Sequence, residues 1–263
     1  MSGSRSGHRV ERFGANRRMV AASATVGRES DTIHAMTEVD ISEPRRRIRA
    51  HRERTGESLS LTAYVVTYLS RALADQPELN AFRRGRRLVV LEDVTVNTLV
   101  EREIDGERVP EPCPIRAAQG KSFREIHDEI RAAQRHASGR MGTLSESPWY
   151  LWLLPEWGMR WFMRLAGRST RMAKRYGVAS VTAIGMFASG ASWAVPLTSG
   201  TVMVTVGGIV RRAVVGDHGA VRDPEHLCLT VSFNHDIVDG APAARFMKRF
   251  AEILSSGEMV EGV

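Results

Sequence analysis

Cysteines, long apolar runs and an apolar leader are scarce or missing in this 263-residue sequence. Its two cysteines, Cys113 and Cys228, are far apart and lie in no C-x-x-C motif, which argues against a disulfide framework and a zinc site. No run of about 18 apolar residues occurs, so we expect no transmembrane helix. The polar, arginine-rich start has no apolar core and cannot be a secretory signal. We therefore expect a cytoplasmic protein with a flexible basic N-terminus (residues 1–18) followed by one domain (residues 19–263).

The sequence also lacks the common short motifs of nucleotide-binding and hydrolytic enzymes. It has no G-x-x-x-x-G-K-[ST] phosphate loop, no G-x-G-x-x-G after a strand, no H-E-x-x-H and no G-x-S-x-G. Its eight histidines show no metal-ligand spacing. We accordingly expect no metal and no tightly bound cofactor.

The charge balance is basic, with 37 Lys and Arg against 30 Asp and Glu and a formal charge of +7. Such an excess suits nucleic acid, an anionic membrane surface or a phosphorylated ligand such as coenzyme A, and it can equally reflect the base composition of a genome. The basic run at residues 45–54 has no interleaved aromatics and no known reader motif. We interpret it as a solvated helix face and expect no nucleic-acid partner.

Hydrophobic periodicity predicts strands and helices in a mixed order, without regular β-α-β alternation. Residues 32–42 alternate apolar and polar side chains as a strand does, whereas residues 59–74 have the spacing of an amphipathic helix with Ser60 as its cap. Ser122 and Glu125 form a capping box. This order predicts an α+β domain with a mixed sheet flanked by helices. Further strands are expected at 86–103, 178–187, 200–210 and 227–235, with a turn at Asp105 and Gly106, a bulge at Gly207 and Gly208, and helices at 43–57 and 242–254.

Residues 147–177 stand apart because they hold four of the five tryptophans. Arginines recur there every three or four residues, which would place them on one face of a single helix past Pro155, with aromatics on another. One interpretation is a basic amphipathic helix, residues 156–175, that touches a membrane surface or a partner. We favour an insertion whose aromatics pack on the domain or a neighbouring subunit while the arginines stay in water. The residues concerned are Trp149, Trp152, Trp157, Trp161 and Leu165, then Arg160, Arg164, Arg168, Arg171 and Arg175.

The stretch NHDIVDG, residues 234–240, places a histidine where an apolar strand ends. Alternate residues of that strand, from Leu227 to Phe233, are apolar, and by parity His235 points to the same side. We therefore expect a partly buried, neutral imidazole, which suits a general base near pH 7. Asp239 precedes a helix, where it can serve as N-cap, as support for the histidine loop, or as both. Taken alone, the histidine fits a satisfied core residue better than a base.

The pattern H-x-x-x-D-G after an apolar strand, followed by APAARF, resembles the signature of the acyltransferase component of 2-oxo acid dehydrogenase complexes. Other stretches resemble that family in the family's own order: RRMVAAS with TIHAMTEVDIS, LSLTAYVVTYLSRALADQPELNA, IRAAQGKSFREIHDEI and SVTAIGMF. These matches cover most of the chain. The family's catalytic domain shares its fold with chloramphenicol acetyltransferase, so the resemblance implies that fold and a homotrimer.

The resemblance also implies an acyltransferase that moves an acyl group between coenzyme A and a dihydrolipoyl-type thiol or another small nucleophile. His235 matches the family's catalytic base, and Thr182 matches the serine whose hydroxyl donates to the oxyanion. Asp239 matches the residue that supports the active-site loop. In the family, base and oxyanion donor meet in a channel between subunits of the trimer. Substrate contacts are expected from Ser180, Asn234 and Gly240.

Departures from the family pattern leave a second function open. Asn234 and Asp236 flank the histidine where the family has Asp and Arg, and Ala183 replaces a polar residue. We expect a stand-alone form with no lipoyl domain, no covalently attached lipoyl group and no subunit-binding domain, so a lipoyl group would come on a separate protein. The alternative is a catalytically inactive trimeric scaffold that binds partners.

Overall fold

The computed structural model describes residues 8, 10, 13–104, 107–135, 154–185, 190–215 and 221–258, with only the backbone for residues 102–104 and 107–109. A six-stranded sheet in the order β1-β10-β7-β6-β4-β5 forms its centre. The sheet strands are β1 (Thr32–Asp40), β4 (Val96–Ile104), β5 (Glu107–Ile115), β6 (Ala179–Ala183), β7 (Val202–Arg211) and β10 (Glu225–Asn234). Two hairpins pair β2 (Ala81–Arg84) with β3 (Arg87–Val90) and β8 (Val214–Val215) with β9 (Val221–Arg222). The helices are α1 (Ala15–Arg28), α2 (Ser42–Thr55), α3 (Leu61–Asp75), α4 (Phe123–Arg135), α6 (Glu156–Gly167), α7 (Thr170–Tyr176) and α8 (Gly240–Ser256), with short 3-10 turns at Pro77–Leu79 and Ala118–Gly120.

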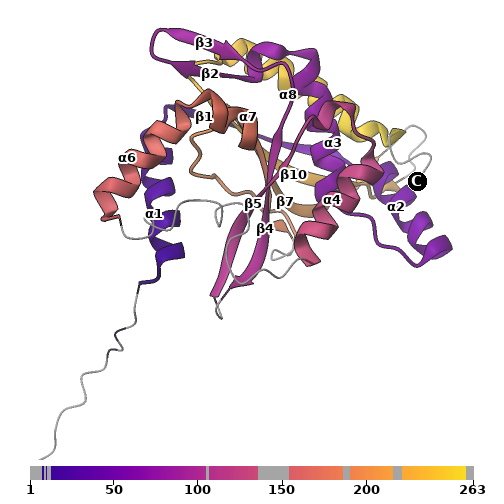
Figure 1. Ribbon diagram of the computed structural model, residues 1–263. Helices are drawn as coiled ribbons and strands as arrows, with labels where there is room; N and C mark the ends of the chain where they lie inside the picture. Colours follow the sequence, from indigo (N-terminus) through magenta and orange to yellow (C-terminus); the bar gives the residue numbers. More distant parts are fainter. Residues whose placement is uncertain are drawn as a thin grey trace, which may run out of the picture.

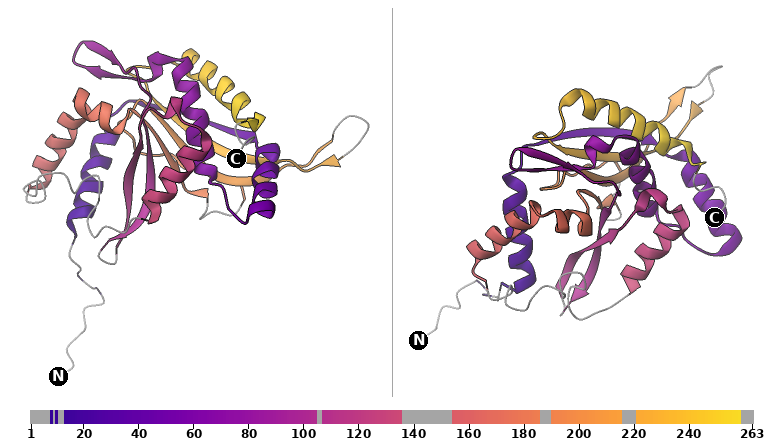
Figure 2. Two further views of the ribbon diagram at one scale, coloured as in Figure 1. Left: turned by 45° about the vertical axis from the view of Figure 1, so that its right-hand side comes forward. Right: turned by 45° about the horizontal axis from the view of Figure 1, so that its top comes forward.

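The sheet is mixed, which confirms the predicted fold class. Strand β6 runs parallel to both of its neighbours, β4 and β7, whereas the other pairs are antiparallel. Helices α3, α4 and α8 pack their apolar faces into the main core on one side of the sheet, and α1 and α6 pack together on the opposite side (Figure 1). The β8–β9 hairpin projects from the body (Figure 2). None of the helices that the structure describes is long and apolar enough to cross a membrane.

Helix α3 is more buried than its sequence predicts. The pattern predicts an amphipathic helix, yet every residue from position 63 to position 70 is buried, because α3 contacts α4 and α8 as well as the sheet. The polar side chains of residues 63–70 find partners there: Tyr64 Oη donates to the carbonyl of Leu254 in α8 (2.5 Å), and Thr67 Oγ1 donates to the carbonyl of Ala63 (2.8 Å). The predicted cap is confirmed, since Ser60 Oγ accepts from the N–H of Ala63 (3.2 Å).

Other local predictions are confirmed as well. Ser122 N donates to Glu125 Oε2 (2.8 Å) while Glu125 N donates to Ser122 Oγ (3.2 Å), which is the expected capping box. The register between β7 and β10 shifts beside Gly207 and Gly208, where an added Cβ would lie within 2.1 Å of a backbone oxygen. The turn expected at residues 105–106 lies outside the described residues, although β4 and β5 on either side of it pair with each other.

Strand β5 lies at one edge of the sheet and carries Pro110, Pro112 and Pro114 at alternate positions. Alternate residues of a strand direct their N–H groups to the same side, so three prolines remove the donors from one side. The ladder with β4 runs along the whole strand, so the missing donors are on the outer side. We infer that these prolines block the addition of another strand at this edge.

Two predicted boundaries are wrong. The N-terminus expected to be flexible through residue 18 is helical from Ala15 onwards. The single helix expected past Pro155 is two helices, because α6 ends at Gly167 and the hydroxyl of Ser169 caps α7, where it accepts from the N–H of Met172 (3.4 Å). The break separates the arginines of α6 from those of α7, so they do not share one helical face.

The exposed tryptophans also differ from expectation. Within the chain, Trp157 is 74% exposed and Trp161 is 62% exposed, so neither packs on the domain. Helix α6 instead buries Met159 against Met19 and Ala22 of α1. Trp149 and Trp152 lie outside the described residues. Packing of the two exposed tryptophans on a neighbouring subunit stays a prediction.

Candidate active site

His235 lies in a turn directly after β10, and backbone hydrogen bonds hold this turn at both ends. The N–H of His235 donates to the carbonyl of Asp31 (2.7 Å), which extends the β1–β10 ladder by one step. Asn234 shapes the turn, because its Oδ1 accepts from the N–H of Asp236 (2.9 Å) and its carbonyl accepts from the N–H of Val238 (3.0 Å). The imidazole is therefore not needed to hold the loop. Asn234 acts here as an organiser of the turn, while its predicted contact with substrate stays a prediction.

The side chain of His235 is 48% exposed, so the expected burial is not reached within one chain. Its Nδ1 lies 3.9 Å from Oδ1 of Asp239, too far for a hydrogen bond but close enough for attraction when the ring is protonated. Asp239 takes the predicted N-cap position before Gly240, the first residue of α8, but its side chain makes no capping hydrogen bond. The carboxylate thus neighbours the histidine instead of capping the helix, and its support of the histidine loop stays a prediction.

Thr182 and Ser180 lie on β6 and face away from the main core. The alternate residues of this strand are in the core, so the two hydroxyls point to the other face of the sheet. Thr182 is level with Thr205 on β7, and Thr205 is level with Thr230 on β10. Oγ1 of Thr205 and of Thr230 is buried and has no hydrogen-bond partner among the described residues. This row of threonines was not predicted from the sequence. Its only signal there is a threonine between apolar residues in each of the three strands.

A single chain does not bring His235 and Thr182 together. Strand β7 lies between β6 and β10, so the two residues are two strand spacings apart across the sheet. They are also five positions apart along the strand direction, from Thr230 to His235. With strands about 4.8 Å apart and a rise of about 3.3 Å per residue, their Cα atoms are about 19 Å apart. Hydrogen bonds span about 3 Å, so a site that uses both groups must take them from two copies of the chain. The predicted residues thus form two groups: His235, Asp239, Asn234 and Gly240 in one loop, and Thr182 and Ser180 on β6.

A contact between Arg83 and Asp236 joins the β2–β3 hairpin to the histidine turn. Arg83 Nη1 donates to Asp236 Oδ2 at 2.9 Å. The two residues are 153 positions apart in the sequence, so no local pattern predicts their contact. Asp236 is one of the departures noted in the sequence, and the structure gives it a partner of opposite charge.

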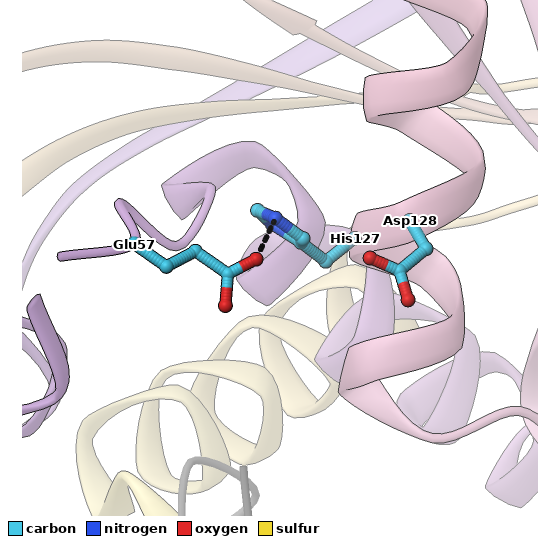
Figure 3. A group of neighbouring side chains, drawn as sticks. All are labelled: Glu57, His127 and Asp128. Carbon is cyan, nitrogen blue, oxygen red and sulfur yellow. Dashed lines mark ion pairs between the residues drawn. The ribbon is translucent and has the colours of Figure 1, made fainter. Parts of the chain in front are cut away.

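Glu57, His127 and Asp128 form a second cluster with the composition of a metal site (Figure 3). The N–H of Ser60 donates to His127 Nδ1 (3.0 Å), which leaves Nε2 facing Glu57 Oε1 (3.6 Å). Arg124 pairs with both carboxylates, at 2.5 Å from Glu57 and 3.2 Å from Asp128. Because this guanidinium supplies the positive charge that the carboxylates attract, and would repel a cation, we interpret the cluster as a structural ion-pair network.

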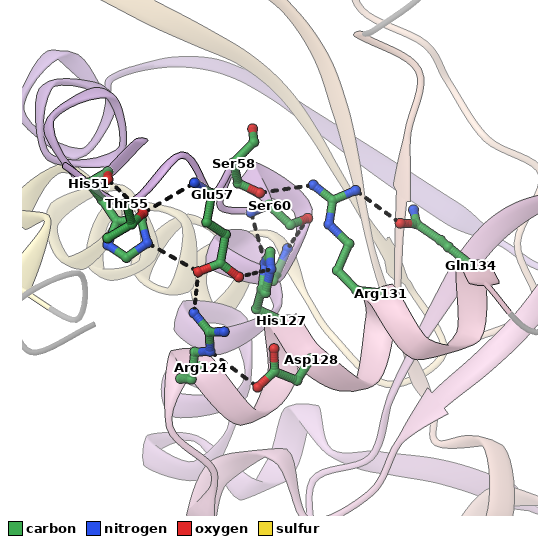
Figure 4. A network of polar contacts seen from close by, with 11 residues as sticks. His51, Thr55, Glu57, Ser58, Ser60, Arg124, His127, Asp128, Arg131 and Gln134 are labelled. Carbon is green, nitrogen blue, oxygen red and sulfur yellow. Dashed lines mark hydrogen bonds and ion pairs between the residues drawn. The ribbon is translucent and has the colours of Figure 1, made fainter. Parts of the chain in front are cut away.

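The same network, drawn with its surrounding contacts in Figure 4, shifts the pKa values of Glu57 and His127. Hydrogen bonds from Arg124 and His51 lower the pKa of the Glu57 carboxyl to about 2. Burial lowers the pKa of His127, and the nearby charge of Arg131 lowers it further. At neutral pH an ionised Glu57 and a neutral His127 therefore join the start of α3 to α4.

Solved structures confirm the predicted fold. A probable dihydrolipoamide acetyltransferase from Listeria monocytogenes 4b F2365 superposes with a TM-score of 0.71 at 20% identity, covering 98% of this chain and 99% of that one. An Azotobacter vinelandii dihydrolipoamide acetyltransferase, in which a serine, a histidine and an asparagine were investigated for their role in the catalytic mechanism, gives 0.69 at 17% identity over 98% and 96%. A chloramphenicol acetyltransferase gives 0.51 at 13% identity over 91% and 94%. The chain has the chloramphenicol acetyltransferase-like fold.

The sequence comparison places the chain more narrowly. The model of the 2-oxoacid dehydrogenases acyltransferase (catalytic domain) family matches residues 8–147 and 167–260, and the chain belongs to this family. The lipoamide acyltransferase component of the branched-chain alpha-keto acid dehydrogenase complex of Bacillus subtilis (strain 168) is 26% identical over 203 residues, which are 76% of this chain. The aligned part is 40% of that relative's length. The family match omits residues 148–166, which lie inside the insertion predicted at residues 147–177.

Proposed function

We propose that this chain transfers an acyl group between coenzyme A and a dihydrolipoyl-type thiol, or another small nucleophile. One observation carries the proposal: the backbone fixes the turn of His235, the imidazole makes no hydrogen bond within the described part of the chain, and Asp239 lies beside it. In the Azotobacter vinelandii enzyme, the investigated histidine and asparagine have the same four-residue spacing. An aspartate offers the same oxygen acceptor for a loop as an asparagine does.

The chemistry needs one base and one hydrogen-bond donor. His235 Nε2 takes the proton of the acceptor thiol as its sulfur forms a bond to the thioester carbonyl carbon. The carbonyl oxygen becomes an oxyanion, to which Thr182 Oγ1 donates. The intermediate then expels the sulfur of coenzyme A, which takes the proton from the imidazolium, so protons and electron pairs balance. Neither a metal nor an attached lipoyl group takes part in these steps.

A second copy of the chain completes this site. The Cα atoms of His235 and Thr182 are about 19 Å apart within one chain, because strand order and register fix their positions in the sheet. This distance supports a site at a subunit interface. We propose a homotrimer in which His235 of one copy faces Thr182 of the next. The neighbouring copy would also cover the half-exposed imidazole and restore the burial that the sequence predicts.

Coenzyme A is then a substrate and not a resident cofactor, and the lipoyl group is carried by a separate protein in the cytoplasm. Thiol release from a panel of acyl-coenzyme A donors, each with dihydrolipoamide or simple alcohols and amines, tests the activity. We expect turnover that falls about 100-fold or more in His235→Ala, the scale of a general base. The matched control is His34→Ala, which removes another exposed histidine and should leave the rate unchanged. A folded trimer with no turnover, or with equal turnover in His235→Ala, would favour the scaffold alternative.

A second role is supported by α6. Trp157 and Trp161 project from it next to Arg160 and Arg164, a combination typical of helices that lie in a membrane interface. We propose that residues 156–175 contact an anionic membrane surface. Co-sedimentation with liposomes that contain anionic lipid should be lost in Trp157→Ala/Trp161→Ala, and the absence of binding by the wild-type protein at low salt would end this proposal.

A further inference from the structure

The tip of the β2–β3 hairpin is strongly basic. Residues 81–91 contain four arginines and no acidic residue. Arg83 is paired with Asp236, while Arg84, Arg86 and Arg87 are exposed and have no ion pair among the described residues. Gly85, at φ +62°, allows the two-residue turn that brings these side chains together at the tip. The tip therefore presents a positive potential to any approaching solute.

The base of the hairpin is fixed to the body of the domain. Phe82 and Leu91 pack with Ala173 of α7 in a small core. Asn80, which is buried, donates through Nδ2 to the carbonyl of Leu91 (2.9 Å) and to that of Asp93 (3.1 Å). The charged tip is thus held in a defined position and is not a loose arm.

The hairpin is also tied to the histidine turn at two points. Arg83 pairs with Asp236, the residue that follows His235. Thr201 also links the two elements, since its Oγ1 donates to the carbonyl of Ala81 and its own carbonyl accepts from the N–H of Asn234. A partner that rests on the hairpin would therefore lie beside the turn that carries His235.

The face of the hairpin that carries Arg83 is apolar as well as basic. Leu88 lies directly opposite Arg83, and Val90 lies two positions further along the same face. Leu88 is 50% exposed and Val90 is 49% exposed. Exposed apolar side chains beside arginines are typical of surfaces that bind another protein.

We infer that the β2–β3 hairpin is the docking surface for an acidic carrier domain that presents a dihydrolipoyl thiol to His235. This inference rests on the proposed function. Positive charge at the tip attracts the acidic surface of the carrier, and Leu88 and Val90 supply the apolar contact. Arginines that bind a phosphate converge on one point. Here Arg84 and Arg87 lie on one face of the hairpin and Arg83 lies on the other, so the three guanidiniums do not extend from one face as a phosphate pocket for coenzyme A would require.

The experiment reverses the charge of the tip without touching the histidine turn. The variant Arg84→Glu/Arg86→Glu/Arg87→Glu is compared with Arg245→Glu/Lys248→Glu/Arg249→Glu, which makes the same change in net charge on the exposed side of α8. The probe is an isolated lipoyl domain of net negative charge, loaded with dihydrolipoyl-lysine, and its Kd is measured by fluorescence anisotropy. Turnover is measured with this domain and with free dihydrolipoamide.

We expect the tip variant to weaken binding of the domain about tenfold or more and to lower kcat/KM for the domain by a similar factor. Added salt should remove most of the difference. Values of kcat/KM for free dihydrolipoamide and of KM for acetyl-coenzyme A should match those of the α8 control. An unchanged Kd for the domain overturns the inference, and so does a rise in KM for acetyl-coenzyme A equal to that for the domain. If the wild-type protein turns over neither acceptor, the proposed function fails, and the anisotropy measurement still decides whether the domain docks at the tip.

Discussion

Two histidines of this chain, His235 and His127, are in opposite environments. His127 is buried, accepts a hydrogen bond from the backbone of Ser60 at Nδ1 and faces Glu57 at Nε2. His235 is half exposed, and its Nδ1 lies 3.9 Å from Oδ1 of Asp239. Both have a carboxylate close by, so residue composition alone does not separate them.

The difference shows what each imidazole can do. Nδ1 of His127 accepts the hydrogen bond that joins α4 to the start of α3, so a proton gained at Nδ1 breaks this connection. The ring of His235 makes no hydrogen bond among the described residues, so the fold leaves it available for chemistry. We therefore interpret the His127 cluster as structural. We interpret His235, whose backbone is fixed while its side chain is available, as part of a candidate site.

The largest expected effect is on catalysis at His235. We expect His235→Gln to reduce the rate of acyl transfer by about 100-fold or more, because the thiol loses its base. The melting temperature should stay close to that of the wild-type protein, since the ring holds no other element. Parallel rate and thermal-unfolding measurements check both parts. A large loss of stability in this variant would remove the contrast with His127.

The rate of acyl transfer should depend on the hydroxyl of Thr182 and not on the shape of its side chain. Thr182→Val keeps the branched side chain and removes the oxyanion donor, and we expect a fall in kcat of about 100-fold. Thr182→Ser retains the donor and should keep most of the activity. If valine and serine at this position give equal rates in steady-state assays, the hydroxyl does not contact the oxyanion.

His127→Leu should have the reverse effect of the His235 variant. It leaves the N–H of Ser60 without its acceptor and Glu57 without one neighbour, and a cost of about 1–3 kcal/mol in the free energy of unfolding is expected. Urea unfolding of the variant and the wild type measures this cost. The value of kcat for the folded variant should be unchanged, and a specific loss of kcat would give the cluster a catalytic role that its geometry does not support.

The smallest effect concerns acid stability. Burial lowers the pKa of His127 in the folded state from the ordinary value of 6.5, so the unfolded state binds more protons as the pH falls below that value. The contribution of His127 to stability is therefore complete above pH 6.5 and declines as the pH falls towards its lowered pKa. Glu57, with a pKa of about 2, keeps its contribution until the pH falls below about 4.5. Melting temperatures at pH 7.5 and pH 5.5 should differ more for the wild type than for His127→Gln, and equal differences would contradict this assignment.

Local order in this fold could be predicted from the sequence because it depends on neighbouring residues. The cap at Ser60, the capping box at Ser122 and the irregularity at Gly207 each follow from a few adjacent side chains. The helix break before Ser169 had a local signal too, a serine in front of a short basic segment, but the regular spacing of the arginines hid it.

The arrangement of the candidate site could be predicted only in part. Strand parity indicated which residues share a face, and the family resemblance indicated which of them matter. The distance between His235 and Thr182 depends on strand order, which no single stretch of sequence encodes. The contact of Arg83 with Asp236 and the full burial of α3 arise from elements far apart in the chain, so sequence periodicity could not predict them.

The central claim, that each site takes its base and its oxyanion donor from different copies, can be tested by mixing two inactive variants. His235→Ala and Thr182→Val are each purified, mixed in equal amounts, unfolded and refolded together, and assayed for acyl transfer. Recovery of roughly a quarter of the wild-type activity is expected, because half of the chains bring an intact histidine and half bring an intact threonine to each interface. Activity no higher than that of the two variants refolded separately would contradict a shared site.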